Sequence, residues 1–281
     1  MSPLKVKAVA VTEFFHLVRT KVFQLSLVLV PAFSLGLTYL SAHAGHSDAA
    51  APADAPSAAL VPVASMALLF LMVMLTTPQM MSSVIEEKMS RISEVLLASV
   101  TPFDLMLGKL LACCAAAALV SAIYLALGLG LAEHFGYASL VSAADVLRFA
   151  FFLVLAVFLH GSMYMAVGAA CSQPKDAQGM LAPLVLLSAV PMIMVNTLAQ
   201  DPSGRLSTAL SLFPLSAPFV LCFRLNGLPG PSPVVVALSI GLTLLTTLFC
   251  VWAASRIFRV GLLAQGKAPG LAQLWHWVFV D

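Results

Sequence analysis

The sequence predicts an all-α, polytopic membrane protein. Of 281 residues, 61% are hydrophobic and only 9% are Asp, Glu, Lys or Arg, and the mean hydropathy is +1.01. Soluble domains carry roughly a quarter charged residues. Six apolar runs each approach or exceed the ~20 residues that a helix needs to cross a bilayer. These observations exclude a soluble enzyme and a disordered chain, and a net charge of +2 gives no reason to expect nucleic acid as a partner.

The first apolar run, 22–40, resembles a secretory signal, because four cations precede it and Ala42-His43-Ala44 imitates a cleavage site. The run is longer than the ~7–15 apolar residues of a signal peptide. We therefore expect a retained first span.

Six spans are predicted in order, with a C-terminal tail over 257–281. Another apolar stretch, 206–223, contains Pro214 and Pro218 and is too interrupted for a span. A short re-entrant or interfacial pair of helices fits it better, shielded by neighbouring helices. The predicted spans are residues 22–40, 60–84, 105–132, 147–171, 179–199 and 233–256.

The positions of the cations predict the orientation. Eleven of the fourteen Lys and Arg residues fall on one side of the predicted spans, and only Arg148, Arg205 and Arg224 fall on the other. Cytoplasmic loops carry the excess of Lys and Arg. We therefore expect both termini in the cytoplasm, as an even number of spans requires, and a location in the bacterial inner membrane.

An amphipathic helix is predicted at about 85–99, between the second and third spans, ending before Thr101-Pro102. Its apolar residues recur at helical spacing, and Glu87 lies four residues before Arg91, in the favourable order. Helices that only rest on lipid headgroups are usually cationic. This one carries three acids against two bases, which favours a protein partner.

The same residues resemble a motif of type-2 ABC exporter permeases, the NatB-like branch. The likeness continues at Asp176-Ala177-Gln178, at Pro214 to Pro218 with Arg224, and from Arg256 to Lys267. The residues that carry the main motif are Glu86, Glu87, Lys88, Arg91, Glu94, Val95, Leu96, Leu97, Ser99, Pro102, Gly108 and Lys109.

This resemblance implies half of a dimeric translocation pathway, as a homodimer or a heterodimer, powered by a separate ABC ATPase subunit that binds ATP and Mg. The segment 1–21 would be an amphipathic connecting helix along the inner membrane face, with Glu13, Arg19 and Lys21 near the ATPase. Gly108 and Lys109 would be cytoplasmic motif residues. A coupling helix would contact the ATPase through Glu86, Glu87, Lys88, Met89, Arg91, Ile92 and Glu94.

One departure concerns the first outer loop. Many NatB-like members carry a large extracytoplasmic domain there, whereas this loop, 41–59, is short. The cargo therefore stays open among hydrophobic or amphipathic molecules, lipids, peptides and sodium.

No catalytic, metal or cofactor site is predicted in this chain. The run from Gly261 to Ala268 imitates a P-loop, but it has Ala where magnesium needs Ser or Thr, and it follows a membrane helix rather than a strand. The five cysteines have no metal-ligand spacing, and His43 and His46 lack a third ligand.

Three polar residues inside spans are possible pathway residues: Gln79, His160 and Asn196. Intramembrane ionisable groups are often functional, although a neutral histidine that packs structurally is the simpler interpretation of His160. A gradient-driven secondary transporter and a non-transporting membrane scaffold or assembly factor are the alternative functions. The lack of a buried membrane carboxylate argues against the first alternative.

Overall fold

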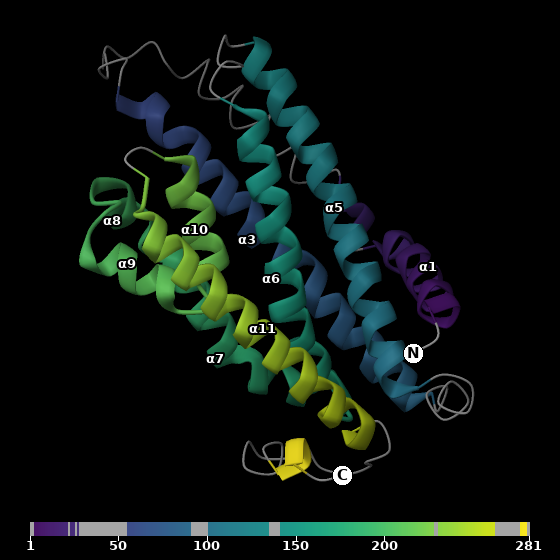
Figure 1. Ribbon diagram of the computed structural model, residues 1–281. Helices are drawn as coiled ribbons and strands as arrows, with labels where there is room; N and C mark the ends of the chain where they lie inside the picture. Colours follow the sequence, from purple (N-terminus) through teal and green to yellow (C-terminus); the bar gives the residue numbers. More distant parts are fainter. Residues whose placement is uncertain are drawn as a thin grey trace.

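The computed structural model describes residues 3–21, 23–25, 27, 55–90, 101–134, 141–227, 230–261 and 276–279. Within these residues the secondary structure is helical, with no strand (Figure 1). The helices are α1 (Pro3–Arg19), α3 (Ala55–Met89), α5 (Pro102–His134), α6 (Ala143–Ala170), α7 (Pro174–Ile193), α8 (Val195–Gln200), α9 (Arg205–Leu212), α10 (Ala217–Asn226) and α11 (Pro233–Gly261).

Five of these helices are long and apolar enough to cross a membrane: Val61–Met89 of α3, Pro102–Glu133 of α5, and α6, α7 and α11. Each corresponds to one predicted span, so the all-α, multi-pass class is confirmed. The first predicted span, 22–40, lies almost entirely outside the described residues. Helix α1 occupies the segment where a connecting helix is expected.

The fifth span differs from its prediction, because 179–199 is not one continuous helix. Helix α7 ends at Ile193, Met194 has φ −95° and ψ 13°, and α8 begins at Val195. Pro191 lies just before this break. A proline lacks the backbone N–H of the helical ladder, and its ring crowds the carbonyl four residues earlier. The break therefore falls where the sequence weakens the helix.

Helix α3 also differs from its prediction. The sequence places a boundary after residue 84, but α3 continues through Ile85 to Met89. These residues are therefore its last turns and not the start of a separate coupling helix. Residues 91–100 lie outside the described part of the chain. The next helix begins at Pro102, where the hydroxyl of Thr101 accepts a hydrogen bond from the Asp104 N–H at 3.2 Å.

The last span is longer than predicted. Helix α11 runs from Pro233 to Gly261, so the first five residues of the expected tail belong to it. A short helical segment follows at 276–279, and residues 262–275 lie outside the described part of the chain.

A pair of short helices is present where the sequence predicts one. Pro214 lies in the turn between α9 and α10, and Pro218 lies in the first turn of α10, where proline is tolerated. With ten residues, α10 is about 15 Å long, roughly half the hydrocarbon thickness of a bilayer. Its residues 217–224 are all buried. It packs mainly on α3 and α6, which supply the shielding that a short helix needs.

Helix α6 is the centre of the bundle and contacts α3, α5, α10 and α11 (Figure 1). Glycines permit the closest of these approaches. A Cβ at Gly168 would lie 2.9 Å from the Met81 carbonyl oxygen on α3, and a Cβ at Gly261 of α11 would lie 2.8 Å from the Ala169 carbonyl oxygen.

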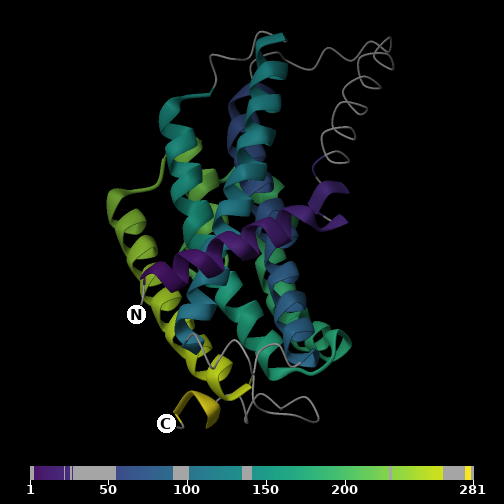
Figure 2. The same ribbon diagram turned by 90° about the vertical axis from the view of Figure 1, so that its right-hand side faces the viewer.

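Helix α1 crosses the long helices instead of running along them (Figure 2). It packs on α5 at Gly108, where an added Cβ would lie 2.6 Å from Val9 Cγ1 and 3.2 Å from the Val6 carbonyl oxygen. Leu17 is buried near the other end of α1. The close approach at Gly108 sets the distance between α1 and α5.

We predict that Gly108→Val separates α1 from α5 and lowers stability by about 1–3 kcal/mol, the usual cost of overpacking. The measurement is thermal unfolding of the purified protein, together with protease accessibility of residues 1–20. Gly128→Val is the matched control, because nothing lies within 4 Å of a Cβ at Gly128 on the same helix. Equal melting temperatures for the two variants would contradict the packing argument.

Candidate functional site

The end of the bundle where α3 ends and α5 begins contains a fully buried lysine. This end is labelled the inner end below, and the opposite end, where α6 begins, the outer end. Lys109 of α5 has 0% of its side chain exposed, and its Nζ lies 2.6 Å from Glu13 Oε1 of α1 and 2.6 Å from Glu87 Oε1 of α3. Nζ also donates to Ser83 Oγ at 3.0 Å. An ammonium has three donors, and here each has an acceptor. The cluster of Lys109, Glu13, Glu87 and Ser83, called the Lys109 cluster below, joins three helices.

The position of the cluster follows from the sequence around it. Gly108 lets α1 approach α5, and the next residue, Lys109, then reaches Glu13 on α1. A buried charge is tolerated only when it is paired and hydrogen-bonded. Two carboxylates face one ammonium, and Glu87 Oε2 is buried without a hydrogen-bond partner in the described structure. The cluster therefore has two carboxyl groups for one ammonium.

A second contact at this end involves the neighbouring residue, Lys88. Its Nζ donates to the Ala169 carbonyl oxygen at 2.8 Å, in the last turn of α6. The last carbonyls of a helix have no partner within the helix and attract cations. Because Gly261 of α11 also lies against Ala169, the inner ends of α3, α6 and α11 meet there.

These contacts give three of the residues expected at the ATPase interface partners within the chain, and their contact with an ATPase stays a prediction. We expected Glu87 and Lys88 to contact a partner subunit, but Glu87 binds Lys109 and Lys88 binds α6. Glu13, expected near the ATPase, also binds Lys109. Met89 is 64% exposed and remains available for a partner. Arg91, Ile92 and Glu94 lie outside the described residues.

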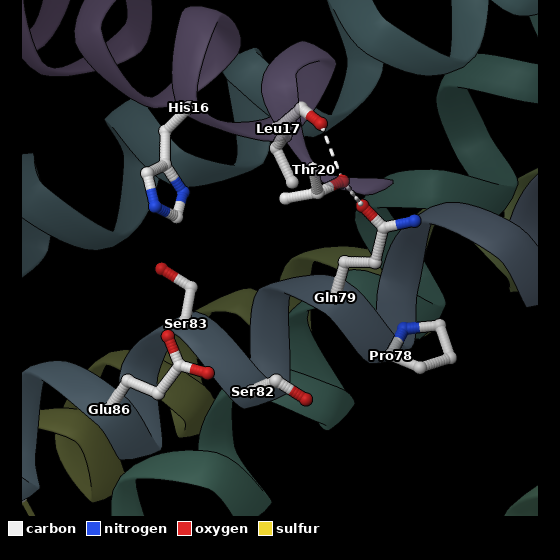
Figure 3. A pocket seen from close by; sticks show the side chains of 8 residues that line it. All are labelled: His16, Leu17, Thr20, Pro78, Gln79, Ser82, Ser83 and Glu86. Carbon is white, nitrogen blue, oxygen red and sulfur yellow. Dashed lines mark hydrogen bonds between the residues drawn. The ribbon is translucent and has the colours of Figure 1, made fainter. Parts of the chain in front are cut away.

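Glu86 and Gln79 line a pocket between α1 and α3 with a volume of about 340 Å³ (Figure 3). Gln79 Nε2 donates to the Leu75 carbonyl oxygen at 3.0 Å, and Gln79 Oε1 lies 3.3 Å from Thr20 Oγ1 of α1. Gln79 therefore belongs to the contact between α1 and α3.

His160 is fully buried on α6. Its Nδ1 lies 3.0 Å from the Ala156 carbonyl oxygen, and its Nε2 lies 3.0 Å from Ser188 Oγ of α7. A carbonyl can only accept, so Nδ1 carries a ring proton, and the Ser188 hydroxyl beside Nε2 also donates to the Leu184 carbonyl oxygen at 2.8 Å. The ring also lies 5.4 Å from that of Phe219 on α10. This geometry supports the structural interpretation of His160.

The three possible pathway residues do not form one site. Asn196 is exposed on α8, whereas His160 bonds to α7 and Gln79 faces α1. In addition, the described residues contain no group of three His, Cys, Asp or Glu side chains that could hold a metal ion. His43, His46 and most of the run from Gly261 to Ala268 lie outside the described residues.

Arg224, noted in the sequence for its place after the Pro214–Pro218 motif, is a second buried cation. It is 3% exposed on α10, and its Nη1 donates to Ser211 Oγ at 2.7 Å and to the Ser207 carbonyl oxygen at 3.4 Å, both on α9. Arg224 therefore ties the two short helices together through neutral oxygens.

Arg148 makes the corresponding contacts at the outer end. It pairs with Asp145 at 2.9 Å and donates to the Leu225 carbonyl oxygen at 2.8 Å. Asn226 in turn donates to Ser65 of α3 at 3.2 Å. The end of α10 is therefore fixed to both α6 and α3.

Comparison with known proteins identifies the family. The profile of the ABC-2 family transporter proteins matches residues 33–256, which is most of the chain. The chain belongs to the ABC-2 transporter family. The resemblance to type-2 ABC permeases is thus confirmed, and the chain is a multi-pass membrane transport protein. The finer assignment to the NatB-like branch stays a prediction.

Two relatives of this ABC-2 protein are uncharacterized proteins. MJ1024 of Methanocaldococcus jannaschii is 26% identical over 220 residues, which cover 78% of this chain and 54% of the relative. YhaP of Bacillus subtilis is 28% identical over 194 residues, which cover 65% of this chain and 46% of the relative. The chain therefore matches about half the length of each relative.

We predict that Lys109→Met destabilises the protein by about 3–5 kcal/mol, because it leaves two buried carboxylates without their cation. Glu13→Gln is expected to cost far less, since it leaves one carboxylate paired with one ammonium. Thermal unfolding in detergent measures both. The triple variant Lys109→Met, Glu13→Gln, Glu87→Gln removes all three charges and should recover much of the loss. A Lys109→Met protein as stable as Glu13→Gln would contradict this account.

We also predict that His160 and Ser188 act as a pair. Ser188→Ala removes the hydroxyl that contacts Nε2 and should cost about 1 kcal/mol, but the same change should cost almost nothing in a His160→Leu background. A double-mutant cycle of unfolding free energies measures this coupling. Additive losses would indicate that the hydrogen bond contributes no stability.

Proposed function

We propose that this ABC-2 protein is the transmembrane permease subunit of an ATP-driven exporter. Two permease subunits, identical or different, form the translocation pathway, and a separate ATPase subunit binds ATP and Mg and supplies the energy. The family and the Lys109 cluster support this proposal, and the cluster is the observation that carries it. Because the cluster joins the last turns of α3 to α1 and α5, a movement of this end of α3 also moves those two helices.

The proposed coupling runs from the segment after Met89 into α3. The last turns of α3 bind α1 and α5 through Glu87 and Lys109, and α6 through Lys88. A displacement of α3 at this end therefore moves α1, α5 and α6 together, since closely packed helices shift as rigid bodies between discrete arrangements. Met89, with its exposed apolar side chain, provides an anchor for the ATPase.

The orientation is part of the proposal. Helix α1 carries Lys5, Lys7 and Arg19 at the same end of the bundle as the Lys109 cluster. By the excess of cations on the cytoplasmic side, this end faces the cytoplasm of a bacterium, and both termini lie there. The ATPase would then reach Met89 directly.

A gradient-driven transporter is less well supported. Proton and sodium carriers place ionisable groups along the pathway. In the five described spanning helices, each Asp or Glu lies in the first or last two turns, as Asp104 and Glu133 of α5 do. Lys109 is the deepest charge of α5, and two carboxylates hold it.

The cargo is proposed to be a hydrophobic or amphipathic molecule, a lipid, a peptide or sodium. Helices α7 and α11 expose many large apolar side chains, among them Leu186, Ile193 and Leu245. Exposed apolar faces of this kind contact lipid acyl chains or an apolar cargo equally well.

The decisive experiment is transport into or out of vesicles that contain the permease and its ATPase. We expect movement of the cargo that stops on ATP depletion and continues when ionophores collapse the proton and sodium gradients. Loss of flux with the gradients would support the secondary transporter, and the absence of any flux with candidate cargoes would support the scaffold.

A structural prediction accompanies this proposal. Met89→Cys should form a cross-link with the ATPase, and Met89→Arg should weaken ATPase association about 5- to 30-fold, as expected for an anchor worth 1–2 kcal/mol. Leu147→Cys is the control, because Leu147 is 73% exposed in the first turn of α6, at the opposite end of that helix from Lys88. Cross-linking at Leu147 and not at Met89 would reverse the proposed orientation.

A further inference from the structure

The pocket between α1 and α3 is built from two walls of different chemistry. Helix α1 contributes His16, the residue after its end is Thr20, and α3 contributes Ser82, Ser83 and Glu86. In Figure 3, His16 points from α1 toward Ser83 and Glu86, which rise from α3 on the opposite wall. The volume of about 340 Å³ leaves room for a small polar group between the walls.

The α3 wall attracts a cation. Glu86 makes no ion pair with any other described residue. Ser83 connects the pocket to the Lys109 cluster, since its hydroxyl oxygen accepts from Lys109 Nζ at 3.0 Å. That cluster holds two carboxylates and one ammonium. Glu86 is therefore the carboxylate of this wall that is open to a cation from the pocket.

The α1 wall offers hydrogen-bond donors to an anion. His16 is exposed on this wall, and Arg19 follows one turn later, also exposed. The Thr20 hydroxyl already donates to the Leu17 carbonyl oxygen at 2.7 Å, so its proton is in use. Ser82 lines the same pocket on α3 and makes no hydrogen bond through its hydroxyl within the described structure. A group with a positive end and a negative end fits both walls.

The pocket lies where lipid headgroups are expected. Helix α1 crosses the spanning helices (Figure 2) and exposes Leu4, Val11 and Phe15. Spacings of seven and four residues put these side chains on one face of the helix. A helix with such a face and with lysines elsewhere on its surface lies in the membrane interface, with its apolar side among the acyl chains. His16 of the pocket follows Phe15 of this apolar face in the sequence.

We propose that this pocket binds the phosphoethanolamine headgroup of a membrane lipid. The primary ammonium pairs with Glu86, and the phosphate accepts hydrogen bonds from His16 and Ser82. A choline headgroup fits less well, because a quaternary ammonium has no N–H to donate and is usually held by aromatic faces, and no Phe, Tyr or Trp is among the described residues that line the pocket. An anionic headgroup without an amine meets the repulsion of Glu86.

The test uses the full-length permease without its ATPase, in nanodiscs or detergent with defined lipids. Mass spectrometry measures which lipids remain bound when equal amounts of phosphatidylethanolamine, phosphatidylcholine and phosphatidylglycerol compete. We expect phosphatidylethanolamine to be retained about tenfold over the other two lipids, because only its primary ammonium donates charge-assisted hydrogen bonds to Glu86. Glu86→Gln should abolish the preference. Glu133→Gln, which removes an exposed carboxylate at the far end of α5, should preserve it.

Equal retention of the three lipids, or an unchanged preference in Glu86→Gln, would overturn the proposal. Soluble glycerophosphoethanolamine provides a further arm. If it competes as strongly per molecule as the lipid, the site is for a free phosphoethanolamine compound and the lipid assignment fails. The measurement needs neither ATP nor a cargo, so its outcome is independent of the exporter proposal.

Discussion

One buried ammonium determines how the inner end of this ABC-2 protein is built. Lys109 cannot reach water, so its charge needs a carboxylate beside it, and Glu13 and Glu87 supply two. These contacts hold α1 across the bundle and hold the last turns of α3 against α5. Loss of the ammonium leaves both carboxylates without a cation, whereas loss of one carboxylate leaves one ion pair.

The two ends of the bundle are held by different chemistry. At the inner end, charges on three helices meet at Lys109, and Lys88 adds α6. At the outer end, Arg148 and Asn226 join α6, α10 and α3 with one partly buried ion pair and neutral hydrogen bonds. The inner end therefore joins more helices through charged groups than the outer end does.

The sequence predicts the spanning helices well because their signal is local. Runs of apolar residues identify α3, α5, α6 and α11, and the prolines identify the α9–α10 pair. The charged motif at 85–99 is also visible, but its periodicity is the same for a separate helix and for a continuation of α3. Only the path of the backbone decides between them, and for Ile85–Met89 it continues α3.

The candidate site is less predictable because its contacts are long-range. Lys109 stands in an otherwise apolar run, which signals a buried cation, but nothing local indicates that its partner is Glu13, 96 residues earlier. That pairing depends on α1 crossing α5 at Gly108. Glu87 and Lys88 point into the bundle because the last turns of α3 pack against α5 and α6. A charge pattern on one helix shows that partners exist, and the tertiary structure decides which they are.

The short helix α10 has a consequence for how the protein is made. A helix of about 15 Å is too short to span a bilayer on its own, and lipid offers no partners for the free backbone groups at its ends. Its eight consecutive buried residues, including Arg224, face mainly α3, α6 and α9. It therefore becomes stable in the membrane only after α3 and α6 have come together. Because α3 and α6 are synthesised before α10, they pack together first, and α10 then folds against them.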